Sequence, residues 1–115
     1  MKYMLLINVD PSAYPDEAAG QKMHGEYMQF TQTIIESGEL VSGEALQGTD
    51  TATCVRVRDG QVSATDGPFV ETKEHLGGYY VVDVKDLDRA IELASQIPDS
   101  RTAAVEIRPI MDMVG

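Results

Sequence analysis

Residues 66–84 read DGPFVETKEHLGGYYVVDV, which is a tight turn, a charged segment and then a run rich in Tyr and Val. The Asp-Gly-Pro start favours a turn, because Asp can bond its own downstream backbone, Gly accepts positive φ and Pro fixes the next φ. The run from Gly77 to Val84 is typical of a β-strand. It is apolar at odd and at even positions, so we expect it to enter a sheet with two apolar faces.

The rest of the chain alternates segments typical of helices and strands. A helix is expected from Pro15-Asp16 to Gly38, and a second helix from Asp86 to Pro98, because these residues suit helix ends. Apolar runs bounded by turn residues predict further strands over residues 2–9, 39–46, 51–58, 61–65 and 103–108. This order predicts a single α+β domain over residues 1–115, with a ferredoxin-like βαββαβ arrangement and an extra short hairpin strand.

In such a fold the helices cover one face of an antiparallel sheet, and the other face needs a second cover. Homodimerisation through the open face is the expected solution. From the alternation along each strand, one face is expected to carry Met4, Leu6, Tyr80, Val82 and Val84, and the other Leu5, Ile7, Tyr79 and Val81.

The composition excludes several classes of function. The net charge of −10 gives no footprint for nucleic acid and would repel anionic membrane surfaces. Cys54 is the only cysteine, so an intramolecular disulfide and a four-cysteine zinc cage are excluded, and a reducing, cytoplasmic location is expected. No stretch approaches the ~20 apolar residues that cross a bilayer. The two histidines show no ligand spacing, so neither a metal nor another cofactor is predicted.

The chain resembles the DGPF branch of the YCII-related family. The resemblance rests on DGPFVETKE at 66–74, LGGYY at 76–80, SGEL at 37–40 and EIRP at 106–109, and it extends over nearly the whole chain. It implies a ferredoxin-like domain that pairs into a dimeric α/β barrel. It also implies a His and Asp pair suspected of acid–base work, and a gene often found beside an extracytoplasmic-function sigma factor.

The resemblance carries over most closely to His24 in the first helix and Asp66 at the head of the turn, as a catalytic pair. Arg56, Arg108, Phe69 and Lys73 are the predicted substrate-binding residues. Each has a structural alternative. Asp66 can serve the turn and anchor Phe69 in the core, His24 can pack beside the helix stripe, Lys73 can belong to a solvated edge, and the arginines can pair with Glu106 or Glu44.

Two functions therefore stay open. The first is a small-molecule-binding homodimer with acid–base, proton-transfer activity on a small anionic or phenolic metabolite. The second is a non-catalytic regulatory partner of an extracytoplasmic-function sigma factor, which would be contacted through the acidic surface.

Overall fold

The structure is a computed structural model that describes residues 1–67 and 73–112. Pro68 and Phe69, the second half of the DGPF turn, lie outside the described residues. The elements in chain order are β1 (Lys2–Val9), η1 (Pro11–Ala13), α1 (Glu17–Glu36), β2 (Leu40–Ala45), η2 (Thr49–Thr51), β3 (Thr53–Arg58), β4 (Gln61–Asp66), β5 (His75–Asp83), α2 (Leu87–Gln96), η3 (Pro98–Arg101) and β6 (Val105–Pro109).

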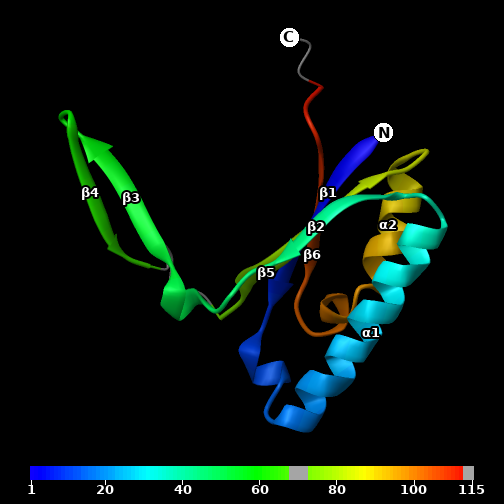
Figure 1. Cartoon of the computed structure of the whole chain (residues 1–115). Helices are drawn as coiled ribbons and strands as arrows, with labels where there is room; N and C mark the ends of the chain where they lie inside the picture. Colours follow the sequence, from blue (N-terminus) through cyan, green and yellow to red (C-terminus); the bar gives the residue numbers. More distant parts are fainter. Residues whose placement is uncertain (68–72, 113–115) are drawn as a thin grey trace.

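The main sheet has the strand order β2-β5-β1-β6, and all three of its pairings are antiparallel. This order and the placement of α1 and α2 on one side of the sheet are compatible with a ferredoxin-like arrangement (Figure 1). The described part of the chain is therefore α+β, as the sequence predicted. The hairpin of β3 and β4 forms a separate two-stranded sheet between β2 and β5 in the chain.

Both α-helices begin and end where the sequence indicated, for local reasons. Asp16 and Asp86 accept hydrogen bonds from the backbone N–H groups of Ala19 and Arg89, which the helices cannot otherwise satisfy. Gly38 adopts a φ of +79° just after α1, and this left-handed conformation stops the helix at little cost for glycine.

The core lies between the two helices and the inner face of the main sheet. Leu5, Ile34, Val82, Leu93 and Ile97 are each fully buried there. Phe30 of α1 meets Tyr80 of β5 edge to face, with ring centroids 5.4 Å apart, which is a favoured aromatic geometry. This packing fixes α1 against β5, and the candidate site lies beside it.

The predicted assignment of side chains to the two faces of the sheet is wrong. Leu5 pairs with Tyr80 and Leu6 with Tyr79, so Tyr80 lies on the inner face with Leu5. The outer face carries Met4, Leu6, Tyr79 and Val81. Side chains do alternate along each strand as predicted. Which residues of a neighbouring strand lie on the same face, however, is decided by the pairing register. The prediction that both faces are apolar holds with this new grouping.

The β3–β4 hairpin extends away from the main sheet (Figure 1). Its turn is Asp59-Gly60, and both residues have positive φ (52° and 75°), as the two-residue turn of a tight hairpin requires. The sequence predicted one extra hairpin strand, whereas in the structure both β3 and β4 lie outside the four-stranded sheet and form a sheet of their own.

Candidate functional site

A groove of about 550 Å³ lies between α1 and the main sheet. This volume suits a small organic molecule. Its lining residues come from β1, α1, β2, β5 and η3, and they are Ile7, Val9, His24, Tyr27, Met28, Thr31, Gln32, Gly43, Glu44, Ala45, Gly77, Gly78, Tyr79, Tyr80 and Asp99.

One side of α1 forms a wall of this groove. His24, Tyr27, Met28 and Thr31 follow one another at helical spacing, so their side chains share that side. Met28 is 62% exposed although it is a large apolar residue. A helix that leaves Met28 uncovered beside a polar set has a face suited to a ligand rather than to the core.

Glycines on the sheet side of the groove leave room that a larger side chain would fill. A Cβ atom at Gly43 would lie 2.8 Å from Cδ1 of Tyr80, and one at Gly77 would lie 2.4 Å from Cγ2 of Val9. These positions therefore need glycine, because any side chain would displace the neighbouring ring or methyl group. The Tyr80 hydroxyl hydrogen-bonds the Thr31 hydroxyl at 2.6 Å and so ties the strand to the helix wall.

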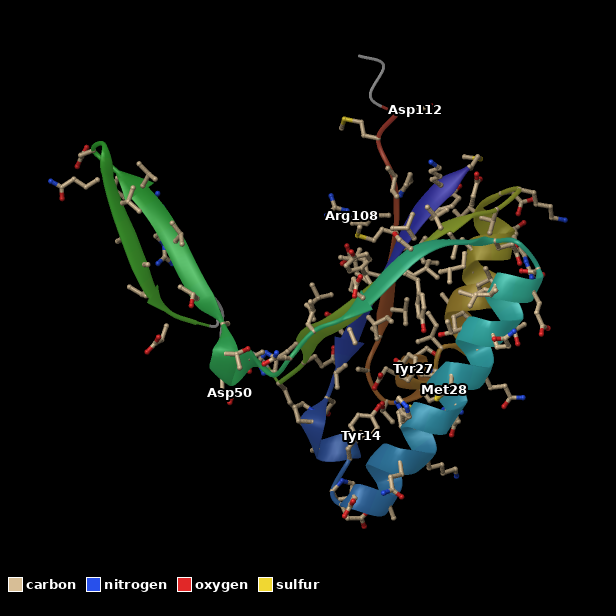
Figure 2. All side chains as sticks on the ribbon, in the orientation of Figure 1. Tyr14, Tyr27, Met28, Asp50, Arg108 and Asp112 are labelled. Atoms are coloured by element: carbon tan, nitrogen blue, oxygen red, sulfur yellow. The ribbon has the colours of Figure 1, made fainter. Side chains whose placement is uncertain are left out.

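Asp99 is the buried charge of the groove, with only 3% of its surface exposed. It lies in η3, directly after α2. The hydroxyls of Tyr14 and Tyr27 donate hydrogen bonds to its two carboxylate oxygens, one each. Figure 2 shows Tyr14 beside η1 and Tyr27 on α1, facing the same region of the molecule. Three segments far apart in sequence thus converge on one carboxylate.

Burial and the negative Asp99 together control the two phenols. Burial, followed by the hydrogen bond to Asp99 and its charge, raises the pKa of Tyr14 and of Tyr27 well above the ordinary value. Both phenols therefore stay protonated at neutral pH, and they act as hydrogen-bond donors to Asp99. Only Tyr27 also lines the groove.

The charge of the groove is negative. Its described lining contains the buried carboxylate of Asp99 but no Lys or Arg, and His24 is its one imidazole. The nearby Arg101 binds Glu26 at 2.5 Å instead. A ligand with a negative charge would therefore meet no compensating cation in the described lining.

The two residues of the predicted catalytic pair lie on different elements of the fold, α1 and β4. His24 lines the groove, at an exposed position of α1. Asp66 is exposed at the end of β4, where it pairs with Thr53, and it does not belong to the groove lining. The structure brings His24 to the same groove as Asp99, not Asp66.

Three of the predicted substrate-binding residues, Arg56, Lys73 and Arg108, are not part of the described groove lining. Arg56 is half-buried on β3 of the hairpin, and Arg108 is exposed on β6, 3.8 Å from the carboxylate of Glu106. Lys73 is exposed, and its positive charge helps to lower the pKa of Asp10, after the larger effect of the Ser12 hydrogen bonds. Phe69 falls on the residues that the structure does not describe.

Asp99 and Tyr14 were not among the site residues predicted from the sequence. Pro98-Asp99-Ser100 has the composition of a helix end, so nothing in the local pattern indicated burial of the carboxylate. The spacing of Met23, Tyr27, Phe30 and Ile34 puts Tyr27 in the apolar stripe of the first helix, and this spacing says nothing of its hydroxyl. One signal was available: His24 lies three residues before Tyr27 and flanks the stripe, so a polar pair at the edge of the stripe could have been noticed.

The described residues include no group of three or more His, Cys, Asp or Glu side chains placed to hold a metal ion. Across residues 1–67 and 73–112, neither α-helix has the length and apolarity that crossing a bilayer demands.

Fold and site together define a small α+β protein with a ligand-sized groove between its first helix and its sheet. The sequence profile of the YCII-related domain matches residues 1–114, and the chain therefore belongs to that family. It is also similar to an uncharacterized protein of Rhizobium meliloti (strain 1021), with 36% identity over 78 residues. That match covers 66% of this chain and 63% of the relative's length.

Proposed function

We propose that the groove binds a small, largely apolar molecule with an ionisable hydroxyl, such as a phenol or an enol, and transfers its proton. The observation that carries this proposal is Asp99, a buried carboxylate that is hydrogen-bonded by two phenols, one of which lines the groove. A buried carboxylate is costly to remove from water, so one beside a ligand-sized groove is a candidate functional group.

The proton path runs through Tyr27. A ligand hydroxyl that donates to the Tyr27 oxygen can pass its proton to that oxygen while Tyr27 passes its own proton to Asp99. Asp99 becomes neutral, Tyr27 stays a neutral phenol, and the ligand becomes the anion. The new Tyr27 O–H then points at the ligand oxygen and stabilises its charge.

His24 is the second acid–base group of the proposed site. It lies one helical turn before Tyr27 on the same side of α1, at the exposed edge of the groove. An imidazole there has a ring nitrogen that can accept a proton from a ligand or donate one to it. In this proposal Asp99, rather than the predicted Asp66, is the carboxylate that acts together with His24.

The charge of the groove favours a phenolic ligand over an anionic one. The buried carboxylate of Asp99 would repel a second carboxylate, whereas a neutral hydroxyl enters without that cost. The overall charge of ligand and site also stays the same during the transfer. The sigma-factor alternative requires only the acidic outer surface and would leave the groove without a ligand.

We also propose that the protein is a homodimer, paired through the outer sheet face into a dimeric α/β barrel. That face carries Met4, Leu6, Tyr79 and Val81, with Glu106 and Arg108 along its β6 edge. An apolar sheet face of this kind needs cover. Light scattering at micromolar concentration should give the mass of two chains, and a clean monomer mass would refute the dimer.

The test of the groove compares Tyr27→Phe with Tyr14→Phe, using 4-nitrophenol and 4-nitrobenzoate as probes in calorimetry. Each variant removes one hydrogen bond to Asp99, but only Tyr27 lines the groove. We expect the phenol to bind the wild type more tightly than the carboxylate. Tyr27→Phe should weaken phenol binding about tenfold, and Tyr14→Phe should change it by no more than about twofold.

Equal losses in the two variants would mean that Tyr27 only supports Asp99 structurally. Tighter binding of 4-nitrobenzoate would reject the phenolic class. Binding of neither probe would favour the non-catalytic function.

A further inference from the structure

The β3–β4 hairpin has one apolar and one polar face, and its pairing register shows this directly. Residues paired across an antiparallel ladder lie on the same face. Val55 pairs with Ala64 and Val57 with Val62, which makes one face apolar. The opposite face carries three further pairs, which are Cys54 with Thr65, Arg56 with Ser63 and Arg58 with Gln61.

The apolar face is uncovered in the chain. Val55, Val57 and Val62 are 63%, 57% and 72% exposed. Within the described residues, β3 and β4 make their substantial contacts with each other and not with the main sheet or the helices. Figure 1 shows the hairpin projecting into solvent. A lone two-stranded hairpin is marginally stable in water, so this element needs a surface to cover its valines.

We propose that the apolar face of this hairpin, residues 53–66, is an arm that packs on a second copy of the chain, so that two arms are exchanged in the dimer. This inference rests on the proposed homodimer and is independent of the chemistry in the groove. Three features of the chain favour a second copy as the occupant.

The first feature is charge. Arg56 and Arg58 balance Asp59 and Asp66 within the hairpin, so the whole net charge of −10 lies on the rest of the chain. Two such chains repel one another over most of their surfaces. The hairpin, with no net charge, is a part of the surface that can approach a second acidic copy without that repulsion.

The second feature is continuity with the outer sheet face. Leu46 and Leu76 lie where the hairpin joins β2 and β5, and they are 49% and 43% exposed. The backbone N–H of Leu46 donates to the carbonyl of Gly77 at 2.8 Å, which holds these two connections side by side. Exposed apolar side chains therefore also occur in the chain segments on either side of the hairpin.

The third feature is area. Strands of six residues and a two-strand width give the arm an apolar face of about 200 Å². Each chain would bury the face of its own arm and an equal area that receives the other chain's arm. With an outer sheet face of about 400 Å², the buried area is about 800 Å² per chain. This is the usual size of a stable interface, and the sheet faces alone supply only about half of it.

The first experiment places the photocrosslinker p-benzoylphenylalanine at Val57 or, as the matched control, at Ser63 on the polar face of the same hairpin. We expect a covalent two-chain product from position 57, with the attachment mapped to the other chain by mixing isotopically labelled and unlabelled protein. Position 63 should give little of this product. Equal yields at both positions, or only attachments within one chain at position 57, would overturn the arm.

The second experiment measures dimer dissociation by analytical ultracentrifugation. The triple variant Val55→Ser, Val57→Ser, Val62→Ser should raise the dissociation constant about 100-fold, because three buried valines are lost per arm. The control Ile35→Ser, Leu87→Ser, Ile91→Ser removes three helix side chains of similar exposure (52%, 48% and 49%) and should change it less than about threefold.

The outcomes separate the two proposals. An unchanged dissociation constant in the valine variant means that the dimer exists without the arm. A monomeric wild type refutes the dimer and the arm together. The groove is judged by phenol binding in either case.

Discussion

The body of the protein buries an aspartate and an aliphatic side chain, whereas the hairpin leaves residues of the same kinds exposed to solvent. In the body, Asp99 is buried and bonded by two tyrosines, and Leu93 is fully enclosed. In the hairpin, Asp66 and Val57 are exposed. Both regions have regular secondary structure, so secondary structure alone does not show which region contributes most to the free energy of folding. The body depends on its own packing, whereas the hairpin has a surface that is complete only when something else covers it.

The largest expected effect compares Leu93→Ala with Val57→Ala. Leu93 is fully buried, so its truncation should lower the free energy of unfolding by about 3 kcal/mol through lost burial and a cavity. At a dilution that keeps the chain monomeric, Val57→Ala should cost less than about 0.5 kcal/mol. Urea denaturation measures both. A cost for Val57→Ala that grows with protein concentration would confirm intermolecular cover, and a large cost at every concentration would show packing within one chain.

The next effect compares two aspartates. Asp99→Asn replaces one oxygen of a buried acceptor by a donor that faces a phenol, and we expect a loss of about 2 kcal/mol. Asp66→Asn on the exposed hairpin should change stability by less than about 0.5 kcal/mol. Thermal unfolding of both variants beside the wild type gives the comparison. Similar losses would mean that Asp66 has structural partners as important as those of Asp99.

Alkaline pH should weaken the body through its tyrosines. The pKa values of Tyr14 and Tyr27 are raised in the folded state, so their contribution is complete below the unfolded value of about 10 and is lost as pH rises above it. The slope should approach about 1.4 kcal/mol per pH unit for each phenol, less any solvent screening. Tyr27→Phe and Tyr14→Phe should each flatten the curve of unfolding free energy against pH. An unchanged slope in both would reject the assignment.

The smallest effect concerns the ion pair between α2 and the start of β2. Arg89 donates two hydrogen bonds to Glu39, at 2.9 and 2.8 Å, and these hold the pKa of Glu39 below its ordinary value. The contribution is therefore present above the unfolded pKa of about 4.3 and is lost as pH falls through the folded value. Glu39→Gln should cost about 1 kcal/mol at neutral pH. The control Glu92→Gln removes the more exposed partner of Arg89 and should cost clearly less.

Much of the fold could be predicted from the sequence because its signals are local. Asp16, Gly38, Asp86 and Asp59-Gly60 mark ends and turns through their own backbone chemistry. Side-chain faces were less predictable. Helical spacing in the second helix allows an apolar stripe through Leu87, Ala90, Ile91, Ala94 and Ile97, yet Leu87 and Ile91 are about half exposed and Leu93, outside that stripe, is buried. Helical spacing alone allows both choices, and only the packing decides between them.

The candidate site was predictable only in part, for a similar reason. His24 could be placed on the first helix and does line the groove. Asp99 could not be chosen among the chain's many carboxylates, because its importance arises from Tyr14 and Tyr27, which are 85 and 72 positions away. Convergence over such separations is decided by strand order and helix placement, and no local pattern records it.

The central claim is that Asp99 accepts the proton of a groove ligand through Tyr27. The most direct measurement follows the side-chain carboxyl carbon of Asp99 by NMR, in protein labelled at aspartate and assigned with Asp99→Asn, while 4-nitrophenol is added. We predict that this resonance moves toward its protonated position in the wild type and in Tyr14→Phe, and stays in place in Tyr27→Phe. A resonance that does not respond to the phenol in the wild type, or that responds equally in Tyr27→Phe, would contradict the claim.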